Sequence, residues 1–255
     1  MIVSKMQKRL NACFPIGRCK MRIIHIIIVS KLFYLFFFVS FCSAQTLPSV
    51  VSENSLVIKL SEGVYKIGTV VLDQDKKLVQ VPGAINMQKG VIEYLAVARG
   101  GKTHESVLVL DIEPIHLQTA LLLLGLEGGQ TIEFQGDFTI PRGDPVEIWV
   151  EWKDPKGKTK KIRGEDLVYN LAEKKTMPRL NWVFTGSRII DSVFAAQVER
   201  SIVATYHDPH TIIDNPLPTG ADDTLYEVNE KLTPKVGTPV VMIVKAVKKS
   251  KNKID

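Results

Sequence analysis

Short runs of β-branched and aromatic residues, separated by turn sequences, recur along this chain from about residue 56 onward. Such runs, bounded by Gly, Pro, Asn or Asp, are typical of β-strands joined by tight turns. The turn sequence at 73–77 predicts a hairpin between Val70–Leu72 and Leu78–Val81. Pro82 and Gly83 are expected to end the second of these strands, because proline cannot donate to a strand ladder. The pattern therefore favours antiparallel sheet.

A second hairpin is predicted around Asp154–Gly157, between an alternating strand at 145–152 and a returning strand at 159–163. The segments Gly143–Val150 and Gly237–Val244 echo each other, since each has a turn, a proline and then an alternating strand. Two explanations of this similarity stay open. One is internal duplication, and the other is two independent uses of a common turn that leads into a strand.

Three helices are expected between the strands. The clearest covers 114–124, where a proline stands at the first position and a glycine follows the last. Apolar spacing predicts two more, at 165–175 and at 222–234. Many strands with a few helices indicate an α+β fold rather than a doubly wound one. We expect mostly antiparallel sheets with about three helices, of which 114–124 is the most buried.

The first 44 residues have the layout of a secretory signal. They contain seven basic residues and no acidic one, and an apolar run extends from Ile23 to Val39. Cys42 and Ala44 supply the small residues expected before a cleavage point, and Met21 is a possible true start. We therefore predict an exported protein, periplasmic or extracellular.

Two alternatives for the leader stay open. It can be retained as a membrane anchor, although Lys31 interrupts the apolar run and the uninterrupted part is shorter than the ~20 residues of a span. It can also be lipidated at Cys42, although the bulky Phe41 precedes that cysteine.

The charge of the whole chain is misleading. A formal charge of +6 and an isoelectric point near 9.1 point toward nucleic acid. Removing the seven basic residues of the leader leaves 26 basic and 27 acidic residues, a net charge of −1. We expect no nucleic-acid partner, and membrane contact only through the leader, if it is retained, or through the basic tail at 248–255.

All three cysteines, Cys13, Cys19 and Cys42, lie in the leader. The remaining body cannot form a disulfide, offer a thiolate nucleophile or hold an iron–sulfur cluster. No cofactor is predicted from the rest of the chain. A divalent metal remains possible at His207, Asp208 and His210, because imidazole and carboxylate are good ligands. Histidines in a surface loop are the plainer interpretation.

The loop Gly100–Ser106 is the strongest candidate for a ligand site. Lys102, His104, Glu105 and Ser106 crowd a short segment just before a buried strand, where binding residues are often found. Histidine is a common general base in enzymes, which makes His104 a candidate for that role. The alternative is that these side chains only satisfy backbone groups of the turn. No Gly-x-Ser-x-Gly elbow and no glycine-rich phosphate loop is present.

Several segments together resemble the bacterial YdjY-domain family. The most specific is Lys102–Ser106 followed by the leucine-rich helix. The segments that carry the resemblance are 81–83, 90–93, 100–106, 120–125, 143–146, 182–187 and 237–240. The resemblance covers residues 68–247 and implies no particular reaction. Some relatives are described as ferredoxin-like, and this chain departs from that description because its body has no cysteine.

The expected organisation is a signal at 1–44, a lead-in at 45–67 with one short strand, a YdjY-like domain at 68–247 and a tail at 248–255. The expected function is a non-catalytic binding module of the envelope or periplasm, whose partner is a protein, a peptide or a small ligand. One alternative is a metal-assisted hydrolase that uses His104, Glu105, His207 and His210. The other is a structural envelope protein.

Overall fold

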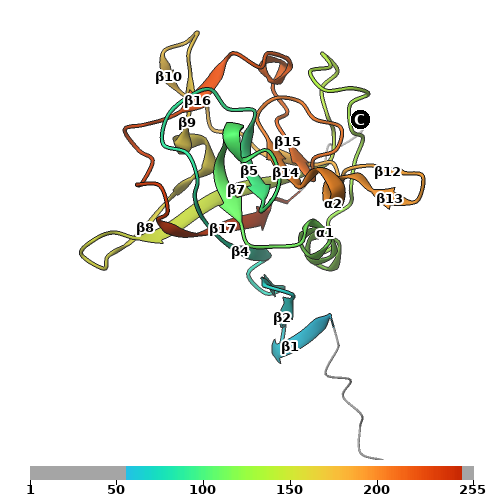
Figure 1. Ribbon diagram of the computed structural model, residues 1–255. Helices are drawn as coiled ribbons and strands as arrows, with labels where there is room; N and C mark the ends of the chain where they lie inside the picture. The colour runs from blue at the N-terminus through green and yellow to red at the C-terminus, as the bar shows by residue number, and fades with distance from the viewer. Residues whose placement is uncertain (1–55, 249–255) are drawn as a thin grey trace, which may run out of the picture. The chain divides into compact units, whose positions relative to one another are not determined.

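The structure, a computed structural model, describes residues 56–248 (Figure 1). The predicted signal at 1–44 and most of the basic tail lie outside the described residues. So does the lead-in up to residue 55. Within residues 56–248, no helix combines the length and the apolar composition that a membrane span needs.

Eight strands form a closed ring, a barrel that encloses the main hydrophobic core. Two neighbouring pairs in it, β5–β6 and β14–β15, are parallel, and the others are antiparallel. In ring order the strands are β4 (Leu78–Ile85), β17 (Pro239–Ala246), β7 (Asp144–Lys153), β11 (Trp182–Phe184), β15 (Ile213–Asp214), β14 (Ser201–Ala204), β5 (Tyr94–Ala98) and β6 (Ser106–Leu110).

The predicted α+β fold with about three helices is therefore wrong. The strands close on one another through β4 and β6 instead of forming open sheets, so one barrel holds the core. The described residues contain two α-helices, α1 (Pro114–Leu123) and the single-turn α2 (Ala195–Glu199).

The predicted helices at 165–175 and 222–234 are wrong, because short strands joined by turns occupy both segments. A 3₁₀ turn, Gly164–Leu167, leads into β9 (Val168–Asn170), which pairs with β16 (Tyr226–Val228) and β10 (Lys175–Thr176). Their β-branched and aromatic residues pack in a three-stranded sheet, and this pairing overrides a helical spacing that spans only two turns.

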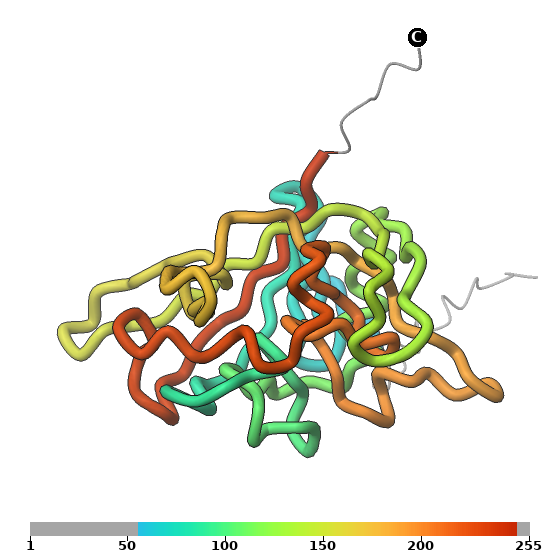
Figure 2. Tube along the Cα trace, turned by 90° about the horizontal axis from the view of Figure 1, so that it is seen from above, coloured from blue at the N-terminus to red at the C-terminus, as the bar shows by residue number. Residues whose placement is uncertain are grey.

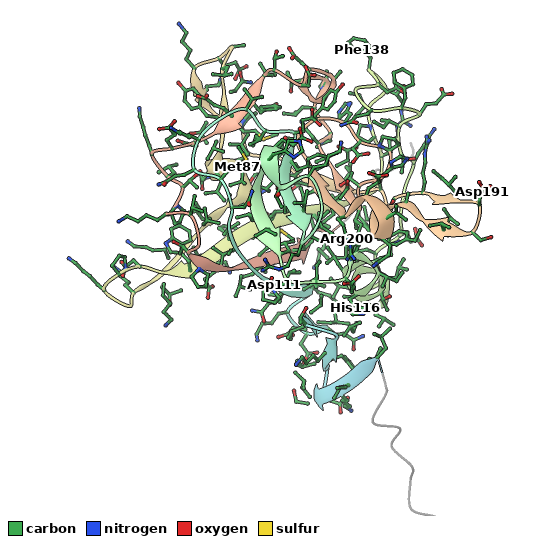
Figure 3. The ribbon with its side chains drawn as sticks, viewed as in Figure 1. Met87, Asp111, His116, Phe138, Asp191 and Arg200 are labelled. Carbon is green, nitrogen blue, oxygen red and sulfur yellow. The ribbon has the colours of Figure 1, made fainter. Side chains whose placement is uncertain are left out.

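Helix α1 nearly matches the sequence prediction in its bounds, and it is buried on one face. Pro114 occupies its first turn, and Gly125 follows its end with a φ of +89°. Leu117, Ala120 and Leu121 are buried, whereas the side chains near its C-terminal end are about half exposed. The helix therefore covers the core with one face only. Charged residues surround its N-terminal end, where Arg200 pairs with Glu113 at 2.7 Å and Arg99 pairs with Asp111 (Figure 3).

The ring closes where β4 approaches β6. Pro82 and Gly83 were expected to end this strand, but β4 continues through them to Ile85. A Cβ atom on Gly83 would lie 2.5 Å from the Val109 carbonyl oxygen, so only glycine allows the two backbones to come this close. The Asp111 amide donates to the Pro82 carbonyl at 2.9 Å and extends the contact. Glycine here marks a close approach of two strands rather than a strand end.

Four further strands extend the sheet beyond the ring. On one side β1 (Val57–Ser61), β2 (Val64–Ile67) and β3 (Val70–Asp73) continue outward from β4, so residues 56–67 hold two strands. On the other side β8 (Thr159–Arg163) pairs only with β7. Both predicted hairpins are thus confirmed. The hairpin of β7 and β8 projects from the ring in both views (Figures 1 and 2). A small hairpin of β12 (Ile189–Ile190) and β13 (Val193–Phe194) stands apart.

We predict that Gly83→Ala destabilises the fold by about 2 kcal/mol or more, because the Val109 carbonyl is backbone and cannot move aside. Urea unfolding of both proteins measures the difference. Gly157→Ala is the matched control, since its site has a positive φ of +78° but nothing within 4 Å of the added atom. The control should lose about 1 kcal/mol. An equal loss in the two variants would contradict the role assigned to Gly83.

Candidate functional site

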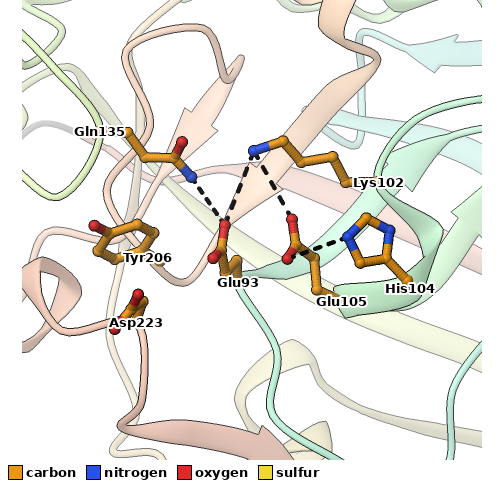
Figure 4. Close-up of a pocket in the computed structure, with 7 residues that line it drawn as sticks. All are labelled: Glu93, Lys102, His104, Glu105, Gln135, Tyr206 and Asp223. Carbon is orange, nitrogen blue, oxygen red and sulfur yellow. Dashed lines mark hydrogen bonds and ion pairs between the residues drawn. The ribbon is translucent and has the colours of Figure 1, made fainter.

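The predicted ligand loop lies where the chain crosses between the parallel strands β5 and β6. It forms a 3₁₀ turn at Thr103–Glu105 and leads directly into β6. Lys102, His104 and Glu105 line a hollow of about 520 Å³ (Figure 4). The fourth predicted residue, Ser106, does not line it. Its buried hydroxyl donates to the Leu108 carbonyl at 3.0 Å, so it serves the backbone.

Four more residues complete the hollow, and they come from distant parts of the chain. They are Glu93 just before β5, Gln135 in the loop before β7, Tyr206 after β14, and Asp223 after the 3₁₀ turn Pro218–Ala221. Gln135 donates to a Glu93 oxygen at 2.9 Å. The ring therefore brings together side chains that the sequence alone leaves unconnected.

An ammonium between two carboxylates is the central feature of the hollow. Lys102 Nζ lies 3.9 Å from Glu93 Oε2 and 3.8 Å from Glu105 Oε1. It donates to the Tyr94 hydroxyl at 3.1 Å and sits 5.2 Å from the centre of that ring. His104 Nε2 is 3.5 Å from the other Glu105 oxygen, with its side chain 79% exposed.

Negative charge exceeds positive charge in this hollow. Glu93, Glu105 and Asp223 face a single lysine, together with an exposed histidine. Burial raises the pKa of Glu93, the charge of Glu105 raises it further, and Lys102 offsets only part of this. A carboxylate with a raised pKa gains from a nearby positive charge. The hollow is thus electrostatically suited to a cation.

Tyr94 connects the hollow to the interior. Its ring is fully buried, and its hydroxyl accepts from Lys102 and donates to Asp208 Oδ2 at 2.9 Å. Burial, and then the charge of Asp208, raise the pKa of Tyr94, which keeps the phenol protonated as a donor. The two groups predicted from sequence, at 102–106 and at 207–210, are therefore linked through this side chain.

The predicted metal ligands have other partners. His207 Nδ1 lies 2.8 Å from the Asp137 carbonyl oxygen, and Nε2 lies 2.9 Å from that of Asn215 and 3.1 Å from that of Leu217. Asp208 Oδ1 accepts from the His210 amide at 2.8 Å, and the His210 ring is 4.0 Å away from it. Within residues 56–248, no group of three His, Cys, Asp or Glu side chains is placed to hold a metal ion.

Asp214 is a second buried carboxylate beside Asp208. It accepts from the Asn215 amide at 2.7 Å and from the Asp208 amide at 3.3 Å. Burial raises the pKa of Asp214 well above its usual value, although the Asn215 amide lowers it, and the charge of Asp208 raises it further. These hydrogen bonds fix the loop that carries His207 and His210.

The family model described as YdjY domain matches residues 70–245. This chain belongs to the YdjY-domain family. A search of curated proteins and a search of solved structures found no significant match. Four of the segments that carried the resemblance lie on the ring, in β4, β7, β11 and β17, and one at 120–125 ends α1. The specific segment 102–106 supplies three residues of the hollow.

Several site residues of this YdjY domain escaped prediction. Glu93 precedes β5 and Tyr94 begins it, and their polar side chains beside an apolar run were the available signal. No sequence signal pointed to Gln135, Tyr206 and Asp223, because only the closed ring brings their loops close to Lys102.

We predict that Tyr94→Phe lowers the free energy of unfolding by about 1–3 kcal/mol, because the buried Asp208 carboxylate loses a hydrogen-bond donor. Urea denaturation measures this loss. The control is Tyr65→Phe on β2, a half-buried hydroxyl that has no hydrogen-bond partner among residues 56–248. If both variants are equally stable, the link between Tyr94 and Asp208 does not hold.

Asp214 should make stability depend on pH. Its pKa is raised in the folded state, so its contribution is full below the unfolded value of about 3.9 and is lost as pH rises toward the folded value. Asp214→Asn removes this titration. We expect the stability difference between wild type and variant to shift in the variant's favour as pH rises from about 4 to about 8. Denaturant midpoints across this range measure it, and a constant difference would contradict the raised pKa.

Proposed function

We propose that this protein is an exported, non-catalytic binding module of the envelope or periplasm. Its ligand carries an ammonium or guanidinium group, which binds in the hollow beside Glu93 and Glu105. The observation that carries this proposal is the pair of carboxylates that share one lysine at 3.8–3.9 Å. The leader at 1–44 and the cysteine-free body support export.

The geometry leaves the carboxylates able to accept further hydrogen bonds. Both distances from Lys102 exceed normal hydrogen-bond length, and the Glu93 carboxylate accepts from the neutral amide of Gln135. A guanidinium group can donate two parallel hydrogen bonds to one carboxylate. Tyr206 lines the same hollow and offers an aromatic wall to a cation.

A binding role accounts better than catalysis for the other candidate residues. The Ser106 hydroxyl and both ring nitrogens of His207 face backbone carbonyls. A catalytic nucleophile needs a neighbouring base within hydrogen-bond distance, and these groups face backbone carbonyls in that place. His104, the remaining base candidate, is exposed, and its Nε2 lies 3.5 Å from Glu105.

We expect N-acetylarginine amide to bind the full chain and the uncharged N-acetylcitrulline amide to bind much more weakly, as measured by isothermal titration calorimetry. Glu105→Gln should weaken the binding of N-acetylarginine amide by about tenfold or more, because it removes a charge-assisted hydrogen bond. Glu199→Gln is the matched control, because Glu199 is an exposed acid on α2 that does not line the hollow. Equal binding of the two amides, or no effect of Glu105→Gln, would refute the proposal.

A further inference from the structure

A strongly basic surface lies on the projecting hairpin and its neighbours, away from the hollow. Its lysines come from the loop between β4 and β5, from the hairpin of β7 and β8, and from the segment before β17. We call it the lysine face, and it consists of Lys89, Lys153, Lys156, Lys158, Lys160 and Lys235, all exposed. The sequence prediction placed basic character only in the tail at 248–255, because these lysines are spread over three segments.

A groove of about 420 Å³ runs through the lysine face. Its floor is apolar and consists of Trp152, Pro155, Leu232 and Pro234. Leu232 is 46% exposed. Lys153 and Lys235 also line it. Gln88 donates to the Thr233 carbonyl at 3.3 Å and holds one wall in place. On β8, Lys160 stands directly opposite Trp152, so a further ammonium group borders the groove.

The positive charge of this face exceeds the negative charge beside it. Within residues 56–248, none of its six lysines takes part in an ion pair. Two acids are nearby. Asp154 lines the groove and accepts the Lys156 and Lys158 amides at 2.9 Å, and Glu230 lines a neighbouring hollow with Lys89. The groove therefore offers apolar area inside a positive rim.

We propose that this groove binds an extended acidic peptide that carries one bulky apolar side chain. The apolar side chain enters the groove over Trp152 and Leu232, and flanking carboxylates lie against Lys153, Lys160 and Lys235. A concave apolar floor suits a side chain, whereas a flat lipid surface would touch the hairpin and leave the floor unfilled. Charge complementarity sets the partner's sign and speeds encounter, and the buried apolar contact supplies affinity.

The test uses the full chain and a fluorescein-labelled heptapeptide with three acidic residues on each side of one phenylalanine. Fluorescence anisotropy should show saturable binding that weakens as salt is raised. The double variant Lys153→Gln and Lys235→Gln should weaken it by about fivefold to tenfold. Leu232→Ser, and replacement of the peptide phenylalanine by serine, should each weaken it as well.

The matched control is Lys66→Gln with Lys245→Gln, two exposed lysines on β2 and at the far end of β17. It should bind the peptide as wild type does, and so should Glu105→Gln, which separates this site from the cation hollow. The proposal fails if the control weakens binding as much as the groove variant. It also fails if a serine-containing peptide binds equally well, or if phosphatidylglycerol vesicles bind the chain while the peptide does not.

Discussion

The close approach of β4 and β6 at Gly83 is the constraint on which the rest of the structure depends. Without it the strands would form an open sheet with unpaired edges. Strand β6 would then no longer connect β5 to β4. Closure positions the loop between β5 and β6, and with it Lys102 and Glu105, opposite the loops that carry Tyr206 and Asp223. A missing side chain at one position thus determines where the polar hollow lies.

The two proposed sites carry opposite charge. The hollow gathers carboxylates around Lys102, and the face around Trp152 gathers lysines with little local compensation. A net charge near zero for the body, computed from composition, hides this separation. Tyr94 adds a connection that charge counting also misses, because it joins the hollow to the buried Asp208.

Local signals predicted what local sequence determines. Both hairpins and the bounds of the helix at 114–124 follow from turn residues, a proline and a glycine, and the structure has them all. Two helices were predicted wrongly because the apolar residues around Val168 and around Val228 have spacings compatible with either helix or strand. The pairing of these two valines across β9 and β16 makes both segments strands. Likewise Lys102, His104 and Glu105 were found as neighbours in sequence, while Glu93 and its companions depend on ring closure.

The position of β17 has a consequence for how the domain is made. This strand is the last one within residues 56–248, yet it lies between β4 and β7 and pairs with both along most of its length. Until residues 239–246 have been synthesised, two strand edges stay unpaired and the core stays open to solvent. Contacts this distant in sequence are slow to form. The nascent chain is therefore exposed to aggregation until β17 has been made, and the ring can close only afterwards.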